Sequence, residues 1–331
     1  MHNPDLPNIV LLGTGGTIAA TADSATTLTD YSVTQGVDSL LTAVPAIASL
    51  ANIRCRQVFN LESHSITNSM LLKLAARVNK ELADSTVDGV VITHGTDTLE
   101  ETAYFLNLTV KSPKPVVIVG AMRPGSAISA DGPLNLYNAV LLAGKPQAAG
   151  HGVLVMLNDK VGAARFISKA STSQVDAFRS YDQGHIGQVH NGRVHIFQTP
   201  APLHTINTDF NVAGVKSLPW VDIIYDHQNA GAHLYEASIH AGARGIVIAA
   251  TGNGSLSPQV RKGIKLAARG KVLCVRSSRV GSGVVSSSAN DGKLGLVSSD
   301  SLNPQKARIL LMLALGITSD RQKIQSYFDR C

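Results

Sequence analysis

Short apolar runs alternate with segments of helical periodicity along the first two thirds of the chain. The apolar runs predict buried strands over residues 9–12, 53–59, 87–92, 116–120 and 153–157. Between the second and third runs, apolar residues recur every three or four positions, which predicts an amphipathic helix over 69–83. A further helix is expected over 99–108, with Asp97 or Thr98 placed to cap it. This alternation up to about residue 196 predicts an α/β domain with a largely parallel sheet.

The pattern changes near residue 197. Residues 197–219 lose their periodicity and collect prolines, which is typical of a linker. Beyond them, strands are expected over 221–225, 245–250 and 272–275, and helices over 233–241, 258–269 and 304–315, the last ended by Gly316. We therefore predict a larger α/β domain over 1–196, a linker over 197–219 and a smaller α/β domain over 220–331, which includes a serine-rich loop at 281–293.

The composition excludes several classes of protein. With 44% hydrophobic and 16% charged residues, the 331-residue chain has the composition of an ordinary globular protein, and it contains no apolar run long enough to cross a membrane. The net charge of +6 comes from scattered basic residues. The densest basic clusters, 261–265 and 276–279, are not interleaved with aromatic residues. We therefore expect neither nucleic-acid binding nor membrane insertion.

The histidines and cysteines show no metal-binding spacing. His185, His190 and His195 recur every five residues, which favours surface positions on a β-hairpin. The three cysteines are too widely spaced for a disulfide framework or a CxxC site. We expect no metal and no other cofactor.

Two threonine-bearing turns follow predicted strands. The first strand runs into Gly13-Thr-Gly-Gly-Thr17, and the third runs into His94-Gly-Thr-Asp97. Both turns are expected at the carboxyl ends of strands, where open α/β sheets place their ligand sites. Either turn alone leaves phosphate binding and nucleophilic attack open, because glycines let a ligand approach the main chain in both cases. Two such turns in one domain favour a site built from paired hydroxyls.

At these turns the chain resembles the bacterial-type L-asparaginase and glutaminase-asparaginase family, its exported members most closely. Thr14-Gly-Gly-Thr-Ile-Ala19 and His94-Gly-Thr-Asp-Thr-Leu-Glu-Glu-Thr-Ala103 match the two family signatures without a gap. Further segments follow in the family order, among them 120–124, 129–133, 276–279 and 302–308. The resemblance implies the two-domain asparaginase-like α/β fold and a homotetramer whose active sites are shared between subunits.

The resemblance also implies catalytic roles for these threonines. Amide hydrolysis needs a nucleophile with a proton acceptor nearby. Thr17 would be served by Tyr31, which lies on a small-residue loop expected to close as a lid. Thr96 would be served by Lys169 and Asp97, because a lysine near a buried carboxylate can share protons with a hydroxyl. The residues alone leave open which threonine attacks; the resemblance favours an acyl-enzyme on Thr17, with Thr96 polarising water in the second step.

Substrate recognition is likewise implied by position in the family. The expected contacts are Gly16, Ser63, His64, Gly95 and the carbonyl of Ala121 in one subunit, and Asn253, Ser255 and Asn290 of a neighbouring subunit. Asp97 is the expected partner of the substrate ammonium.

The chain departs from the family pattern at two of these positions. Asn290 stands where relatives carry an acidic residue that lies near the substrate amine. Either Asp291 takes over this role, or the register of the segment is shifted relative to the family. His64 stands where glutamine or glutamate is usual. At position 255 the chain has serine in place of asparagine, and in this it resembles family members that also accept glutamine. A smaller side chain leaves room for the additional methylene of glutamine, although discrimination by one methylene is worth only about 1–3 kcal/mol.

We thus expect hydrolysis of L-asparagine to L-aspartate and ammonia, and of L-glutamine to L-glutamate. One alternative is a catalytically impaired amino-acid-binding protein, which the Asn290 departure favours. Another is a nucleotide-binding module, which Gly13-x-Gly15 suggests although Ile18 replaces the third glycine of that fingerprint. The expected compartment is the periplasm, for a mature form without its signal peptide; the alternative is the cytoplasm.

Overall fold

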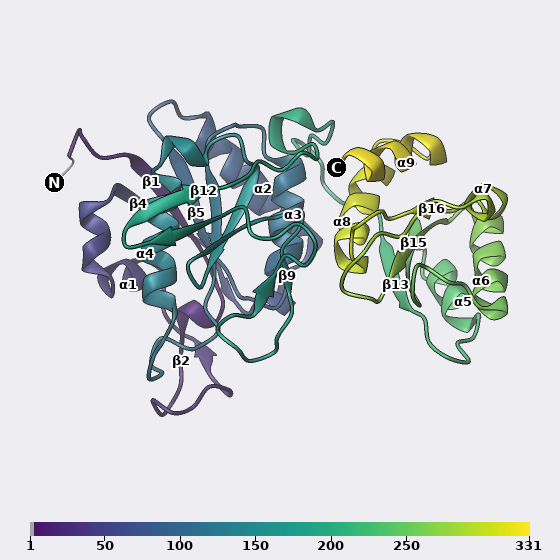
Figure 1. Cartoon of the computed structure of the whole chain (residues 1–331), viewed down its shortest axis with the longest axis horizontal. Coiled ribbons are helices and arrows are strands. Elements are labelled where there is room, and N and C mark those ends of the chain that lie inside the picture. Colours follow the sequence, from purple (N-terminus) through teal and green to yellow (C-terminus); the bar gives the residue numbers. More distant parts are fainter. Residues whose placement is uncertain (1–2) are drawn as a thin grey trace. The chain divides into compact units, whose positions relative to one another are not determined.

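The computed structural model describes residues 3–331, and the chain divides into two compact units between Gly214 and Val215 (Figure 1). Each unit is an α/β structure, as the sequence predicted. The division falls inside the segment expected to be a linker. Most of that segment belongs to the first unit: Lys111 Nζ donates to the carbonyls of Thr205 (3.1 Å) and Thr208 (2.8 Å), and Phe210 is buried. No helix of residues 3–331 is long and apolar enough to cross a membrane.

An eight-stranded sheet forms the centre of the first unit, in the order β12-β11-β8-β7-β6-β5-β1-β4. The five strands from β7 to β4 are parallel: β7 (Val153–Leu157), β6 (Val116–Val119), β5 (Gly89–Thr93), β1 (Asn8–Gly15) and β4 (Asn52–Leu61). Antiparallel strands extend it at one edge: β8 (Lys160–Ala163), β11 (Gly187–His190) and β12 (Arg193–Ile196). His190 and His195 are exposed on the β11–β12 hairpin, as predicted, but the prediction was wrong for His185, which precedes β11 and is half-buried.

Helices cover both faces of this sheet (Figure 1). One face carries α1 (Val37–Thr42) and α4 (Gly132–Ala143), and the other carries α2 (Asn68–Ala83) and α3 (Leu99–Thr109). The predicted helices at 69–83 and 99–108 are α2 and α3. Strands β1, β5, β6 and β7 are buried on both faces because helices lie above and below them, so they read as continuous hydrophobic runs, whereas β4 at the edge of the sheet stays partly exposed.

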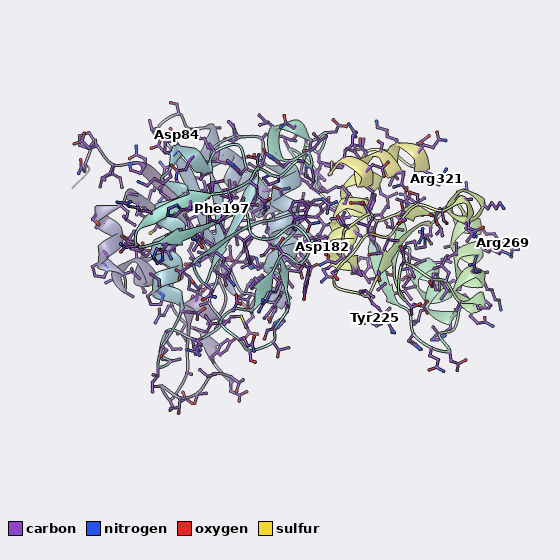
Figure 2. The ribbon with its side chains drawn as sticks, viewed as in Figure 1. Asp84, Asp182, Phe197, Tyr225, Arg269 and Arg321 are labelled. Carbon is purple, nitrogen blue, oxygen red and sulfur yellow. The ribbon has the colours of Figure 1, made fainter. Side chains whose placement is uncertain are left out.

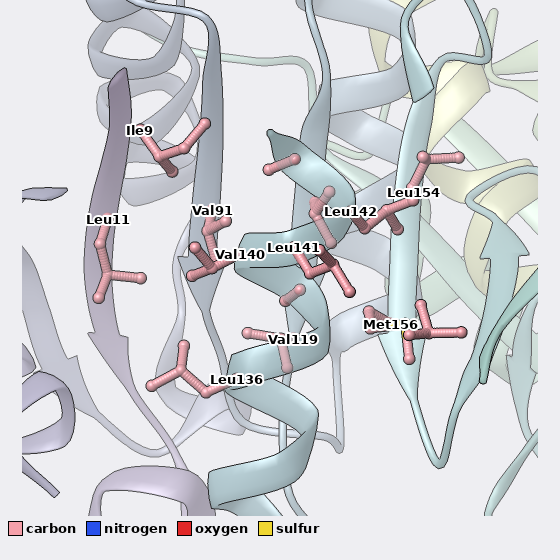
Figure 3. Close-up of a cluster of buried hydrophobic side chains, with 14 of the residues drawn as sticks. Ile9, Leu11, Val91, Val119, Leu136, Val140, Leu141, Leu142, Leu154 and Met156 are labelled. Atoms are coloured by element: carbon pink, nitrogen blue, oxygen red, sulfur yellow. The ribbon is translucent and has the colours of Figure 1, made fainter. Parts of the chain in front are cut away.

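Helix α4 was missed in the sequence, and its packing explains why. Leu136 and Val140 meet Ile9, Leu11 and Val91 of the sheet in one buried cluster (Figure 3). Nine of the twelve residues of α4 are buried and the three others are Pro133, Leu134 and Tyr137, so the helix shows no polar face and no amphipathic period. Gly132 and Pro133 at its start are the signal that could have identified it.

The second unit contains a four-stranded parallel sheet in the order β13-β14-β15-β16. Its strands are β13 (Val221–Tyr225), β14 (Gly245–Ala250), β15 (Leu273–Ser278) and β16 (Val297–Ser298). Its helices are α5 (His233–His240), α6 (Pro258–Arg269), α7 (Ala289–Leu294), α8 (Pro304–Leu315) and α9 (Arg321–Arg330). Ser257 and Asn303 cap α6 and α8 by accepting backbone N–H groups, which is why those two helices were readable from the sequence.

Two elements of this unit differ from the prediction. Part of the expected serine-rich loop is helix α7, because the N–H of Ser288 donates to Asp291 Oδ2 (2.7 Å) and starts a helical turn. A further helix, α9, follows the one expected to be last; Asp320 caps it. The basic side chains Arg269 and Arg321 lie at different places on this unit (Figure 2).

Candidate active site

The two threonine turns pack directly against each other through glycines. Gly15 and Gly16 have φ angles of +94° and +83°, which only glycine adopts without strain. A Cβ atom on Gly16 would lie 2.2 Å from both N and Cα of Gly95. This contact brings the turn after β1 and the turn after β5 together, so that Thr17 and Thr96 line the same pocket.

Thr17 is buried and its hydroxyl has one close partner. The Oγ1 atom of Thr17 lies 2.8 Å from the hydroxyl oxygen of Tyr31. Tyr31 ends the loop that was expected to be a lid, and the short strands β2 (Ala20–Thr21) and β3 (Ser32–Val33) bracket this loop. This hydrogen bond places the Tyr31 hydroxyl where it can relay the hydroxyl proton of Thr17.

Thr96 contacts a lysine and, through it, a carboxylate. Lys169 Nζ donates to Thr96 Oγ1 (3.0 Å) and to Asp97 Oδ1 (2.6 Å). Lys169 belongs to the short strand β9 (Ser168–Lys169), which pairs with β10 (Phe178–Arg179). The expectation of a buried carboxylate was wrong, because the side chain of Asp97 is 61% exposed whereas that of Lys169 is 18% exposed. Asp97 lies at the mouth of the pocket, where it can also meet a substrate.

Ser63 connects β4 to the start of α3. Its carbonyl accepts the Thr98 hydroxyl (2.8 Å), and its Oγ accepts the Thr98 N–H (3.3 Å). Thr98 occupies the N-cap position of α3 without a side-chain cap, so the capping expected of Asp97 or Thr98 is wrong. The side chain of Thr98 fixes Ser63 instead, and its role was not recognised from the sequence.

A pocket of about 400 Å³ contains both threonines. Its lining also includes residues that were not predicted: Leu28, Thr29, Asp30, Glu62, Met122, Arg123, Thr172 and Ser173. Charges of both signs surround it, since Lys169 and Arg123 lie there with Asp30, Glu62 and Asp97. His64 Nε2 lies 3.3 Å from Glu62 Oε2 at this wall. A small pocket with charges of both signs suits a zwitterion such as a free amino acid.

Ala121 follows β6 and is fully buried. The turn that contains it is held by Asp131, whose carboxylate accepts the N–H groups of Met122 (2.9 Å) and Arg123 (3.0 Å). Met122 and Arg123, the two residues after Ala121, line the pocket. The segment 120–124 had been noted in the sequence, but these two residues had not been predicted to line the site.

His94 lies beneath the second threonine turn. Its Nδ1 donates to the Gly95 carbonyl (2.7 Å), and the ring is completely buried. Burial, opposed by that hydrogen bond, lowers the pKa of His94 to about 4. The imidazole is therefore neutral at physiological pH and supports the turn that bears Thr96.

Asn253, Ser255 and Asn290 all lie in the second unit, where each is exposed. Asp291, one alternative partner for the substrate amine, is not available for that role. Its carboxylate is buried and pairs with Arg276 at 2.6 Å. Burial alone would raise the pKa of Asp291, but hydrogen bonds from Arg276 and Ser288 and the charge of Arg276 lower it below its ordinary value.

The cysteine thiols do not contribute to this pocket. Burial raises the pKa of Cys274 to about 12, and burial together with Asp38 raises that of Cys55 to about 11. Neither thiol lines the pocket. Among residues 3–331, no group of three or more His, Cys, Asp or Glu side chains is arranged to hold a metal ion. The pocket lining does include the hydroxyls of Thr17 and Thr96.

Two family models match the chain. The model described as "Asparaginase, N-terminal" matches residues 8–202, and the model described as "Glutaminase/Asparaginase C-terminal domain" matches residues 220–328.

Individual relatives are similar over nearly the whole chain. L-asparaginase 2 of Bacillus subtilis is 53% identical over 326 residues, which are 98% of this chain and 87% of the relative. A probable periplasmic L-asparaginase of Haemophilus influenzae is 47% identical, over 98% of this chain and 93% of the relative. The crystal structure of a probable cytoplasmic L-asparaginase from Campylobacter jejuni superposes with a TM-score of 0.96 at 47% identity, covering 98% of this chain and all of that one.

Proposed function

The chain belongs to the glutaminase/asparaginase family, and we propose that it hydrolyses the side-chain amides of L-asparagine and L-glutamine, releasing ammonia. The relatives give no support to a binding protein without activity or to a nucleotide-binding module. The observation that carries the proposal is the pair of buried threonine hydroxyls in one pocket, each with its own proton-transfer partner.

The first half-reaction uses Thr17. Its Oγ1 attacks the amide carbon of the substrate while Tyr31, whose hydroxyl oxygen lies 2.8 Å away, relays the hydroxyl proton towards the amide nitrogen. The C–N bond of the resulting tetrahedral adduct breaks, and the amide nitrogen leaves as ammonia with the proton that Thr17 has lost. The substrate acyl group remains as an ester on Thr17.

The second half-reaction uses Thr96. A water molecule replaces ammonia, and the Thr96 hydroxyl, hydrogen-bonded to Lys169 at 3.0 Å, orients and polarises it. Asp97, 2.6 Å from the lysine, balances the positive charge of Lys169. Attack of this water on the ester releases the free acid and returns the proton to Thr17.

Recognition of the amino-acid end is assigned to residues at the pocket wall. Ser63 and His64 bind the α-carboxylate and α-amine region, and Asp97 binds the ammonium. Gly16 and Gly95 let the substrate approach the main chain, and the Ala121 carbonyl receives the leaving amide.

The rest of the site comes from a neighbouring subunit. We propose a homotetramer in which Asn253 and Ser255 of one subunit contact the substrate held by another. Asn290 takes the place of the acidic residue of relatives, and it meets the substrate amine through its amide oxygen. Because Asp291 is already paired with Arg276, recognition of the amine depends on Asp97 of the subunit that holds the substrate.

We propose the periplasm as the compartment of the protein. The Haemophilus relative is named as periplasmic, whereas the Campylobacter structure is named as cytoplasmic. Fractionation of the source cells distinguishes the two: asparaginase activity released by osmotic shock supports the periplasm, and activity retained with cytoplasmic markers supports the alternative.

Ammonia release tests the proposed function. It is measured from L-asparagine and L-glutamine at micromolar to millimolar concentrations, for the wild type, Thr17→Ala and Thr96→Ala. Both variants should lose activity by orders of magnitude. Thr42→Ala is the matched control, because its exposed hydroxyl only donates to the Asp38 carbonyl. An assembled wild type that releases no ammonia from either amide would refute the proposal.

A further inference from the structure

Arg276 lies at the centre of a buried network in the second unit. It lies on β15 and is only 5% exposed. Its guanidinium forms a two-pronged ion pair with Asp291, from Nε to Oδ1 (2.9 Å) and from Nη2 to Oδ2 (2.6 Å). Two loops that come from different parts of the chain meet at this pair: residues 251–255, after β14, and residues 284–288, which lead into α7.

The first loop, 251–255, contacts the guanidinium through its main chain. Arg276 Nη1 donates to the Asn253 carbonyl at 3.1 Å. Gly254 has a φ of +71°, and a Cβ atom there would lie 2.4 Å from Nη1. Glycine is therefore required at position 254, because the backbone has a left-handed conformation there and any side chain would clash with the guanidinium.

The second loop, 284–288, contacts the same pair. Arg276 Nη2 donates to the Ser286 carbonyl (2.7 Å), and Asp291 Oδ2 accepts the Ser288 N–H (2.7 Å). A direct bond also joins the two loops, because Ser286 N–H donates to Asn253 Oδ1 (3.1 Å). The loop 251–255 contains Asn253 and Ser255, and Asn290 directly precedes Asp291 in the first turn of α7, so the pair contacts or adjoins the segments that carry all three residues.

We propose that Arg276 and Asp291 are positioning residues that hold Asn253, Ser255 and Asn290 together as one unit for presentation to a neighbouring subunit. This inference rests on the proposed function, which assigns those three residues to substrate binding. A buried ion pair contributes little net stability, because desolvation offsets its Coulomb energy. Its donors instead specify geometry: the planar guanidinium reaches both loops and the carboxylate at once, which a lysine ammonium cannot do.

The double variant Arg276→Met/Asp291→Asn separates positioning from folding. It leaves no unpaired buried charge, and the amide oxygen introduced at position 291 can still accept the Ser288 N–H, so α7 keeps its first turn. The carbonyls of Asn253 and Ser286 lose their donor. The control is Arg308→Met, which removes the donor to the Val221 carbonyl (3.0 Å) of the same unit and touches neither loop.

We expect the KM of the double variant for L-asparagine to rise by about tenfold or more while kcat changes by less than about threefold, because only binding contacts are displaced. Backbone hydrogen exchange should accelerate in both loops, and the control should match the wild type. Arg276→Lys keeps the positive charge and should raise KM to a smaller degree. If the double variant does not fold, Arg276→Lys provides the test in its place.

A folded double variant with wild-type KM and wild-type exchange in both loops would overturn the inference. A wild type that releases no ammonia would instead refute the proposed function, and hydrogen exchange would then decide alone whether the pair holds the loops together.

Discussion

Gly16 lies against Gly95 so closely that a Cβ atom on Gly16 would be 2.2 Å from the Gly95 backbone. This contact fixes the distance between the two threonine turns. Since Thr17 and Thr96 follow these glycines directly, the relative position of the two hydroxyls depends on it.

Gly16→Ala should therefore lower activity by about a hundredfold. The added methyl group forces the turns apart, and a displacement of about 1 Å of a reacting group can cost about a hundredfold in rate. The control is Gly150→Ala, at a φ of +76°, where a Cβ atom would have no other atom within 4 Å. It carries only the strain of a left-handed residue, about 1–2 kcal/mol.

Steady-state kinetics and thermal unfolding check this pair of variants. Gly150→Ala should lower the melting temperature and keep kcat/KM, whereas Gly16→Ala should lower kcat/KM. A Gly16→Ala enzyme with the kcat/KM of the wild type would show that the contact between the turns does not set the position of the threonines.

Lys169→Met should lower kcat by about 10²–10⁴-fold, the usual contribution of proton transfer by a side chain. Stability should change by no more than about 1 kcal/mol, because the partner carboxylate of Asp97 is largely exposed and such pairs are weak. Lys114→Met is the control: its ammonium donates to the Asp84 carbonyl (2.7 Å), away from the pocket. Equal activity losses in the two variants, measured by ammonia release, would argue against a specific role for Lys169.

The stability of the folded protein should fall as the pH decreases, and the protonation of His94 should cause part of this loss. The unfolded chain protonates this histidine near pH 6.5, whereas the folded protein keeps it neutral down to about pH 4. Between these values the unfolded state binds the additional proton, so stability rises with pH and is lost as the pH falls from 6.5 to 4. The loss amounts to about 3 kcal/mol.

Urea unfolding at several pH values measures this effect. His94→Asn, which can still donate to the Gly95 carbonyl but does not titrate, should lose less stability than the wild type over the same range. Identical pH dependence in both proteins would mean that His94 does not contribute to it.

Ser255→Asn should shift the preference towards asparagine. The larger side chain takes the space of one methylene in the substrate, which is worth about 1–3 kcal/mol, or a ten- to two-hundredfold change in the ratio of kcat/KM values. The ratio of kcat/KM for L-glutamine to kcat/KM for L-asparagine checks this prediction. Ser301→Asn, the same substitution elsewhere in the second unit, is the control. An unchanged ratio would indicate that position 255 does not contact the substrate.

Most of the parallel sheet could be predicted because its strands are buried on both faces; the run at 153–157 coincides with β7. The turn motifs similarly indicated which hydroxyls share a site. Contacts between residues that are far apart in the sequence could not be predicted. Nothing in the sequence indicates that the Thr98 hydroxyl donates to the Ser63 carbonyl rather than capping its own helix. The exposure of Asp97 and the ion pair of Asp291 with Arg276 depend in the same way on tertiary packing.

The central claim is that Thr17 becomes acylated. Rapid acid quenching of the enzyme during turnover of L-asparagine, followed by proteolysis and mass spectrometry, locates any covalent intermediate directly. We predict an aspartyl ester on Thr17, accumulating in the wild type or in Thr96→Ala and absent from Thr17→Ala. An active enzyme whose ester is found on Thr96, or that retains activity in Thr17→Ala, would contradict the account.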